Sequence, residues 1–215
     1  MISIIIPVKN QLYYTKHVYH EIKTKCPYEH EIIFINDNST DETEAFLSMI
    51  EDENTIVVTQ KENIGVNKAR NIGVSMARND LCLIINNDVV FTPETIKNLV
   101  EKADRESHKI VCPVTTHKNN KREMPVFVKD NNICWRCYLV RKQDNLFPIP
   151  EELVLRYGDD WLYQKICKKP QRVGESMVHH FESKSINSRD IKTRVSNTIG
   201  KDKIERDRIK WENWW

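Results

Sequence analysis

Short apolar runs rich in β-branched residues alternate with helix-patterned segments over the first hundred residues, and this alternation constrains the fold more than any other feature. The apolar runs predict strands, and the segments between them predict helices. Strands joined by helices form right-handed crossovers, so we expect an α/β domain with a mostly parallel sheet and helices on both faces. The expected strands are 2–8, 31–36, 55–59 and 81–85, and the expected helices are about 12–25, a segment after 40, 65–78 and 93–102.

Polar residues mark the starts of two of these helices. Ser39 or Thr40 is expected to cap the second helix, whose first turn would then hold the carboxylates of residues 41, 42 and 44. Thr92 is expected to cap the helix that Pro93 opens.

The pattern beyond residue 101 is less regular. It predicts strands at 109–114, 124–128, 133–140 and 172–179 and an amphipathic helix at 159–168. After residue 183 the chain is charged and is expected to be helical from about 190. We therefore expect a single Rossmann-like domain over 1–183 and a basic C-terminal helical extension over 184–215.

Several classes of protein are excluded by simple features. The longest apolar runs, at about 4–8 and 81–85, are far shorter than the roughly 20 residues that cross a bilayer, so no transmembrane segment is expected. Lys9 and Asn10 interrupt the first run before a signal peptide could form, so we expect a cytoplasmic protein with reduced thiols. Cys134 and Cys137 lie in a strand pattern that sends them to opposite faces, which disfavours a zinc or redox site.

Charge is distributed unevenly along the chain. Residues 1–101 carry 9 Lys/Arg and 15 Asp/Glu, a formal charge of −6, whereas residues 102–215 carry 24 and 16, a formal charge of +8. A basic second half is compatible with an anionic partner, and equally with an ordinary solvated surface.

Polar clusters follow three of the expected strands, at 9–10, 36–38 and 86–88. Parallel sheets bind ligands at the carboxyl ends of their strands, so these clusters are the candidate site. The five glycines form neither a GxGxxG nor a Walker A loop, which excludes the ordinary Rossmann and P-loop phosphate sites. A carboxylate at a strand end can instead hold Mg²⁺ or Mn²⁺, and Asp88 is the strongest candidate for that role.

Five segments, taken in order, resemble the motifs of inverting family 2 glycosyltransferases of the GT-A fold. They are SIIIPVKN (3–10), NDNSTD (36–41), NIGVNKARNIG (63–73), NNDV (86–89) and GDDW (158–161), and a sixth, VHHFES (178–183), resembles the late histidine motif of that family. The resemblance covers residues 1–183 and implies a nucleotide-sugar-binding half over 1–101 and an acceptor half over 102–183.

The resemblance also implies roles for individual residues. The donor nucleotide would be held by six residues, Pro7, Val8, Asn10, Asp37, Arg70 and Asn87, with Arg70 approaching the diphosphate. A divalent metal, Mn²⁺ or Mg²⁺, would be bound by Asp88 and His180, although Asn86 replaces the first acid of the family's Asp-x-Asp motif.

The acidic pair of the fifth motif would act on the acceptor. Asp160 would be the catalytic base that removes the proton of the acceptor hydroxyl, and Asp159 would orient the acceptor. A single displacement at the anomeric carbon would then invert its configuration.

Each assignment has a purely structural alternative. Asp37 and Asp41 can cap the following helix, Arg70 can be an exposed helix residue, and Asp159 and Asp160 can cap the helix at 159–168. His180 can be an ordinary core or surface histidine.

The sequence does not decide which class of molecule is the acceptor. A glycan, such as a lipid-linked glycan of the cell envelope, is the expected acceptor. The alternative is a hydroxymethylated base in DNA, contacted by the +8 half and by the aromatic and basic residues at 135, 136, 138, 141 and 142. A further alternative is an inactive module that only binds a sugar nucleotide.

Overall fold

The computed structural model describes residues 1–92, 94–105, 109–116, 136–154, 158–159, 161–162 and 171–180, with the backbone alone at 105, 114–116 and 171–180. The expected strand at 124–128, the residue Asp160, most of the expected helix at 159–168 and the extension at 184–215 lie outside the described residues. The same holds for Cys134 of the CxxC pair.

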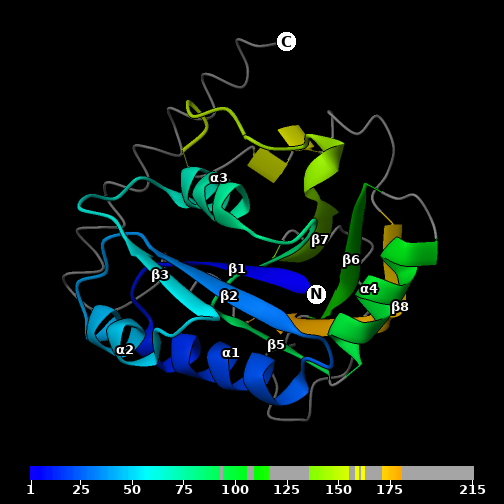
Figure 1. Cartoon of the computed structure of the whole chain (residues 1–215), viewed down its shortest axis with the longest axis horizontal. Coiled ribbons are helices and arrows are strands. Elements are labelled where there is room, and N and C mark those ends of the chain that lie inside the picture. The colour runs from blue at the N-terminus through cyan, green and yellow to red at the C-terminus, as the bar shows by residue number, and fades with distance from the viewer. Residues whose placement is uncertain are drawn as a thin grey trace.

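The described residues form a mixed sheet of eight strands with helices packed around it (Figure 1). The strand order is β3-β2-β1-β4-β7-β6-β8-β5. The helices are α1 (Leu12–Lys25), α2 (Thr43–Ile50), α3 (Val66–Met76) and α4 (Thr95–Arg105), with a short 3-10 turn at Lys142–Asp144. The strands are β1 (Ile2–Val8), β2 (His30–Asn36), β3 (Thr55–Thr59), β4 (Leu81–Ile85), β5 (Val89–Phe91), β6 (Ile110–Thr116), β7 (Cys137–Arg141) and β8 (Gln171–His180).

The first four strands of the chain confirm the predicted α/β arrangement. β3, β2, β1 and β4 pair in parallel, and Figure 1 shows α3 on one face of these strands and α1 and α2 on the other. β7 lies antiparallel to both β4 and β6, and β6 and β8 are parallel. All the residues of β1 are buried, because a parallel strand is covered by helices on both faces.

Close approach of α3 to the sheet depends on Gly73. A Cβ at this position would overlap the side chain of Ile5, which is fully buried in β1. The absence of a side chain at Gly73 therefore lets the helix lie directly on the strand.

One expectation about local structure is wrong, and one strand was not predicted. α2 begins at Thr43, and the Ser39 hydroxyl accepts a hydrogen bond from the backbone N–H of Asn10 (2.8 Å) instead of capping the helix. The sequence pattern does not predict β5, which begins directly after Asp88 and pairs antiparallel with β8. Its three residues are too few to show an alternating pattern.

The position of β5 shows that the sheet is strongly curved. β4 and β5 are four places apart in the strand order, which in a flat sheet corresponds to about 19 Å. The chain from Ile85 to Val89 can span at most about 14 Å. The strands between β4 and the edge strand β5 must therefore curve so that β5 comes back toward β4. An irregularity in register between Pro113 and Val114 of β6 is of the kind that permits such bending.

Candidate active site

The loops that follow β1 and β2 are joined by several hydrogen bonds. The backbone N–H of Asp37 donates to the carbonyl of Val8 (2.7 Å), and the side-chain oxygen of Asn10 accepts from the N–H of Thr40 (2.6 Å). Lys9 Nζ donates to the carbonyls of Asp37 and Asn38 (2.9 Å each). Asn10 and Asn38 have left-handed φ angles of 56° and 54°, which asparagine tolerates better than most residues. Hydrogen bonds within the protein thus hold the two loops at this edge of the sheet together.

Asp37 is buried and faces the turn before α3. Its carboxylate accepts hydrogen bonds from the N–H groups of Ile64 (2.6 Å) and Gly65 (3.1 Å). The alternative in which Asp37 merely caps α2 is therefore wrong, whereas Asp41 does accept a bond from the N–H of Thr43 at the start of α2 (3.1 Å). Asp37 links the end of β2 to the beginning of α3.

The turn after β4 packs against the start of α1. The Asn87 amide donates to the hydroxyl of Thr15 (3.0 Å) and to the carbonyl of Asn10 (3.3 Å). Asp88 follows it and is 6% exposed. Burial, together with the nearby Tyr13 and the charge of Asp88, raises the pKa of Tyr14 in the first turn of α1.

The backbone places the two predicted metal ligands on adjacent segments. β5 pairs with β8 so that Val89, the residue after Asp88, lies opposite His180. A carboxylate and an imidazole are a donor set that suits Mn²⁺, with the remaining positions open to phosphate and water oxygens. Among the described side chains, no group of three or more His, Cys, Asp or Glu residues forms a metal-binding cluster.

Arg70 is not an exposed helix residue. Its side chain is 6% exposed, and Nη1 lies 2.9 Å from Oδ1 of Asp159, whose side chain is 35% exposed. The guanidinium also lies 5.7 Å from the ring centre of Tyr138. Burial opposes the positive charge, but Tyr138 and Asp159 outweigh burial, and the pKa of Arg70 is raised. In this structure Arg70 therefore holds the first acid of the predicted acidic pair.

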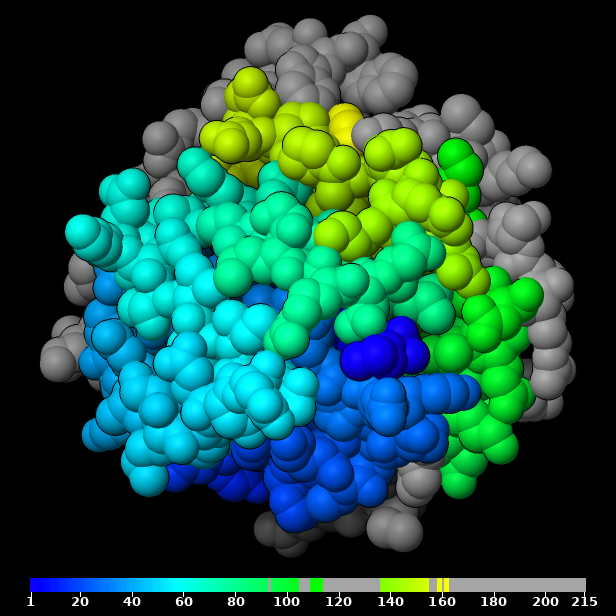
Figure 2. Space-filling view, viewed as in Figure 1, coloured from blue at the N-terminus to red at the C-terminus, as the bar shows by residue number. Residues whose placement is uncertain are grey.

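The sequence pattern does not predict two asparagines that hold the segment 149–154 against α3. Asn67 and Asn71 lie one turn apart on α3 and bond to the backbone of Leu153 and Ile149, respectively. Figure 2 shows the segment 136–154, in yellow-green, packed against α3. Both asparagines are in the motif at 63–73. A sequence pattern does not show which residues of a helix face a segment that lies 78 to 86 positions away in the chain.

Two residues assigned to a DNA interface have other surroundings. Tyr138 is fully buried beneath Arg70, so it is not available to stack on an extruded base. Arg141 pairs with Asp80 (3.2 Å) and Asp104 (2.9 Å), and the register places it opposite Leu81, at the end of β4 away from Asp88.

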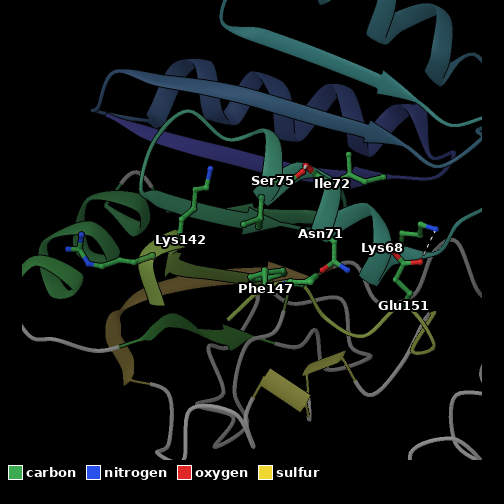
Figure 3. A pocket seen from close by; sticks show the side chains of 10 residues that line it. Lys68, Asn71, Ile72, Ser75, Lys142, Phe147 and Glu151 are labelled. Atoms are coloured by element: carbon green, nitrogen blue, oxygen red, sulfur yellow. Dashed lines mark hydrogen bonds and ion pairs between the residues drawn. The ribbon is translucent and has the colours of Figure 1, made fainter. Parts of the chain in front are cut away.

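A cavity of about 370 Å³ lies between α3 and the segment 141–151 (Figure 3). Its lining includes Asn71, Ile72, Ser75, Lys142 and Phe147, and none of the residues predicted to bind the donor or the metal or to act in catalysis borders it. Lys142 Nζ donates to the carbonyl of Ala77 (2.7 Å), near the end of α3.

Comparison with known proteins identifies the family. The model of the family described as "Glycosyl transferase family 2" matches residues 3–163. This chain belongs to glycosyl transferase family 2. The predicted family and the predicted class of enzyme, a glycosyltransferase, are thereby confirmed.

Two named relatives match a shorter part of the chain. Bactoprenol glucosyl transferase of Shigella phage SfV is 34% identical over 109 residues, which are 47% of this chain and 34% of that protein. The SfII prophage-derived bactoprenol glucosyl transferase of Shigella flexneri matches to the same extent. The chain thus spans about a third of the length of these curated relatives.

Solved structures confirm the predicted GT-A fold. S. aureus TarS 1-349 in complex with UDP is similar with a TM-score of 0.68 at 17% identity, over 86% of this chain and 61% of that chain. GalNAc-T7 with UDP, GalNAc and Mn²⁺ is similar with a TM-score of 0.70 at 14% identity, over 84% of this chain and 43% of that chain. None of the helices among the described residues is long and apolar enough to cross a membrane.

Proposed function

We propose that this chain is the catalytic domain of a cytoplasmic, inverting glycosyltransferase that uses a nucleotide-sugar donor. The observation that carries the proposal is the convergence of Asn10, Asp37, Asn87 and Asp88 at the carboxyl ends of β1, β2 and β4, where an α/β sheet binds its ligand. Support for the donor class comes from structures of similar fold that were solved with UDP and with UDP-GlcNAc.

Within this site, Asp37 and the loop from Pro7 to Asn10 are proposed to bind the nucleoside. The loop is held in place by hydrogen bonds to the residues after β2, so little conformational entropy is lost when a nucleotide binds. Asn87 connects this loop to the turn that carries Asp88.

Asp88 and His180 are proposed to hold Mn²⁺ or Mg²⁺. The pairing of Val89 with His180 supports this assignment, as does the Mn²⁺ named in the GalNAc-T7 structure. A bound divalent ion would supply the positive charge that offsets the charge developing on the leaving diphosphate. An ion bound by Asp88 and His180 would lie near the strand ends where the proposed donor loop also lies.

Asp160 is proposed to be the general base. An acceptor hydroxyl is a weak nucleophile, so a carboxylate must remove its proton as the oxygen attacks the anomeric carbon. Asp159 is paired with Arg70, which suits a residue that orients the acceptor and does not remove its proton. Asp159 is proposed to orient the acceptor.

The acceptor is proposed to be a polyprenyl phosphate lipid or a glycan carried on one. The relatives that support this acceptor are bactoprenol glucosyl transferases. No contact among the described residues favours DNA as the acceptor, because Tyr138 is buried and Arg141 is paired with two carboxylates.

The test is nucleotide release from UDP-glucose and UDP-GlcNAc with MnCl₂, with and without undecaprenyl phosphate. We expect slow release by the chain alone and faster release with the lipid. Asp160→Asn should abolish the lipid-stimulated reaction while UDP binding, measured by calorimetry with Mn²⁺, is retained. Asp88→Asn should weaken that metal-dependent binding. UDP binding without any release, with either sugar and with or without the lipid, would instead support the inactive module.

A further inference from the structure

The first turn of α3 is joined to the segment that leads to the acidic pair. The side-chain amide of Asn67 donates to the carbonyl of Leu153 (2.8 Å), and its backbone N–H donates to the carbonyl of Val154 (3.3 Å). Asn67 is 1% exposed. One residue therefore holds two successive peptide groups of a segment 86 positions away.

The same side chain lies against Gly158. A Cβ at Gly158 would overlap the amide of Asn67, so the backbone just before Asp159 lies directly on this side chain. The Asn67 oxygen accepts from Arg70 Nη1 (3.4 Å), and the same nitrogen donates to Asp159 (2.9 Å). Asn67 thus contacts both the backbone and the ion pair that hold Asp159.

Asp37, the proposed nucleotide-binding residue, contacts the turn just before Asn67 at the start of α3. Asp37 accepts from the N–H of Gly65, and Gly65, with a φ of 86°, packs so closely on Val154 that a Cβ there would overlap Val154. Asn67 follows two residues later. The turn at 65–67 is therefore in contact with both Asp37 and the acidic segment.

We propose that Asn67 is a positioning residue of the transfer reaction. It sets the place of Gly158 and Asp159, the two residues that precede the proposed base in the chain, relative to Asp37, the proposed nucleotide-binding residue. This inference rests on the proposed function. Its role differs from that of Asn71, which bonds to Ile149 one turn further along α3. Among the described residues, Asn71 has no hydrogen bond to Gly158 or Asp159.

The first experiment compares Asn67→Ala with Asn71→Ala in steady-state release of UDP from UDP-glucose with MnCl₂ and undecaprenyl phosphate. Misplacing a catalytic group by about 1 Å can lower the rate about 100-fold, so we expect kcat of Asn67→Ala to fall about 10- to 100-fold. The KM for the donor should stay close to the wild-type value. Asn71→Ala should lose thermal stability to a similar degree but keep its kcat. Equal kcat in the two variants would refute the proposal.

The second experiment uses the contact with Gly158. Gly158→Ala alone should lower kcat, because the added methyl group displaces Asn67. In the Asn67→Ala background the methyl group has room, so Gly158→Ala should cause little further loss. If the two losses multiply in the double variant, the contact does not position the acidic pair.

A conservative variant guards against a folding failure. Asn67→Asp has nearly the same shape, but its carboxylate cannot donate to Leu153 and attracts Arg70 away from Asp159. We expect it to fold, to bind UDP and to have a reduced kcat, and a wild-type kcat would refute the proposal. If the wild-type chain itself releases no UDP from any donor, the proposed function fails instead, so the two failures are distinguishable.

Discussion

Removal of the carboxylate that pairs with Arg70 is expected to destabilise the fold. The guanidinium is 6% exposed and lies over the ring of Tyr138, so it cannot turn outward to water without leaving its site. Asp159→Ala takes away the negative charge and leaves this cation buried. Asp159→Asn keeps an oxygen that can accept from Nη1 but removes the charge.

The magnitude follows from how deeply each partner is buried. Removing one partner from a fully buried ion pair costs about 3–5 kcal/mol. Asp159 is 35% exposed, so water can occupy part of the vacated space, and contact with the Tyr138 ring retains part of the stabilisation. We therefore expect a loss of about 2–3 kcal/mol for Asp159→Ala and about 1–2 kcal/mol for Asp159→Asn.

Urea denaturation at neutral pH measures these losses, and the melting temperature should fall by about 2–4 °C for each kcal/mol. The matched control is Glu151→Ala, which breaks the ion pair between α3 and the same segment at Lys68 (3.2 Å). Both of those side chains are well exposed, at 42% and 71%, so the control should lose less than about 1 kcal/mol. If Asp159→Ala is no less stable than the control, then Arg70 does not depend on Asp159 for its burial.

Three further outcomes are expected from other parts of the chain. Burial alone would raise the pKa of Glu31, but hydrogen bonds from Ser3 and Arg78 outweigh burial, and the pKa of Glu31 is lowered in the folded protein. The ionised Glu31 therefore stabilises the fold at pH values above its pKa in the unfolded chain. This stabilisation is lost as the pH falls through the pKa of Glu31 in the folded protein. The free energy of unfolding should therefore fall less steeply with decreasing pH in Glu31→Gln than in the wild-type protein. Identical pH profiles would contradict a lowered pKa of Glu31. Gly73→Ala should cost about 1–3 kcal/mol in urea denaturation because of the overlap with Ile5, and a neutral effect would mean that α3 can move away. Burial raises the pKa of Cys82 to about 12, so iodoacetamide at mildly basic pH should label this thiol only in the unfolded protein, as read by mass spectrometry.

Local pattern was sufficient to predict the parallel half of the fold. The structure has β1, α1, β3 and β4 with the predicted bounds, because each is a continuous apolar run or an amphipathic repeat with polar residues on both sides. The antiparallel pairing of β7 with β4 and the strand β5 depend on contacts between distant segments. A three-residue strand has no periodicity of its own, so the sequence carried no local signal for β5.

The candidate site was predictable where its residues follow strands. Asn10, Asp37 and Asp88 end successive parallel strands, and that position alone brings them to one edge of the sheet. The role of Asn67 and the ion pair of Arg70 were not predictable in this way, because both depend on how the segment at 149–159 crosses α3. The cap expected at Ser39 failed for a similar reason, since the hydroxyl bonds to the loop after β1.

The placement of β5 also implies an order of assembly during synthesis. β1 to β4 can pair as soon as the first 85 residues have left the ribosome, because the parallel strands and their helices are contiguous in the chain. β5 waits for β8, which begins 80 residues after β5 ends. At about 5–20 residues per second, this delay lasts roughly 4–16 seconds. The nascent chain would therefore hold the paired strands β1 to β4 for several seconds before β8 brings His180 opposite Val89.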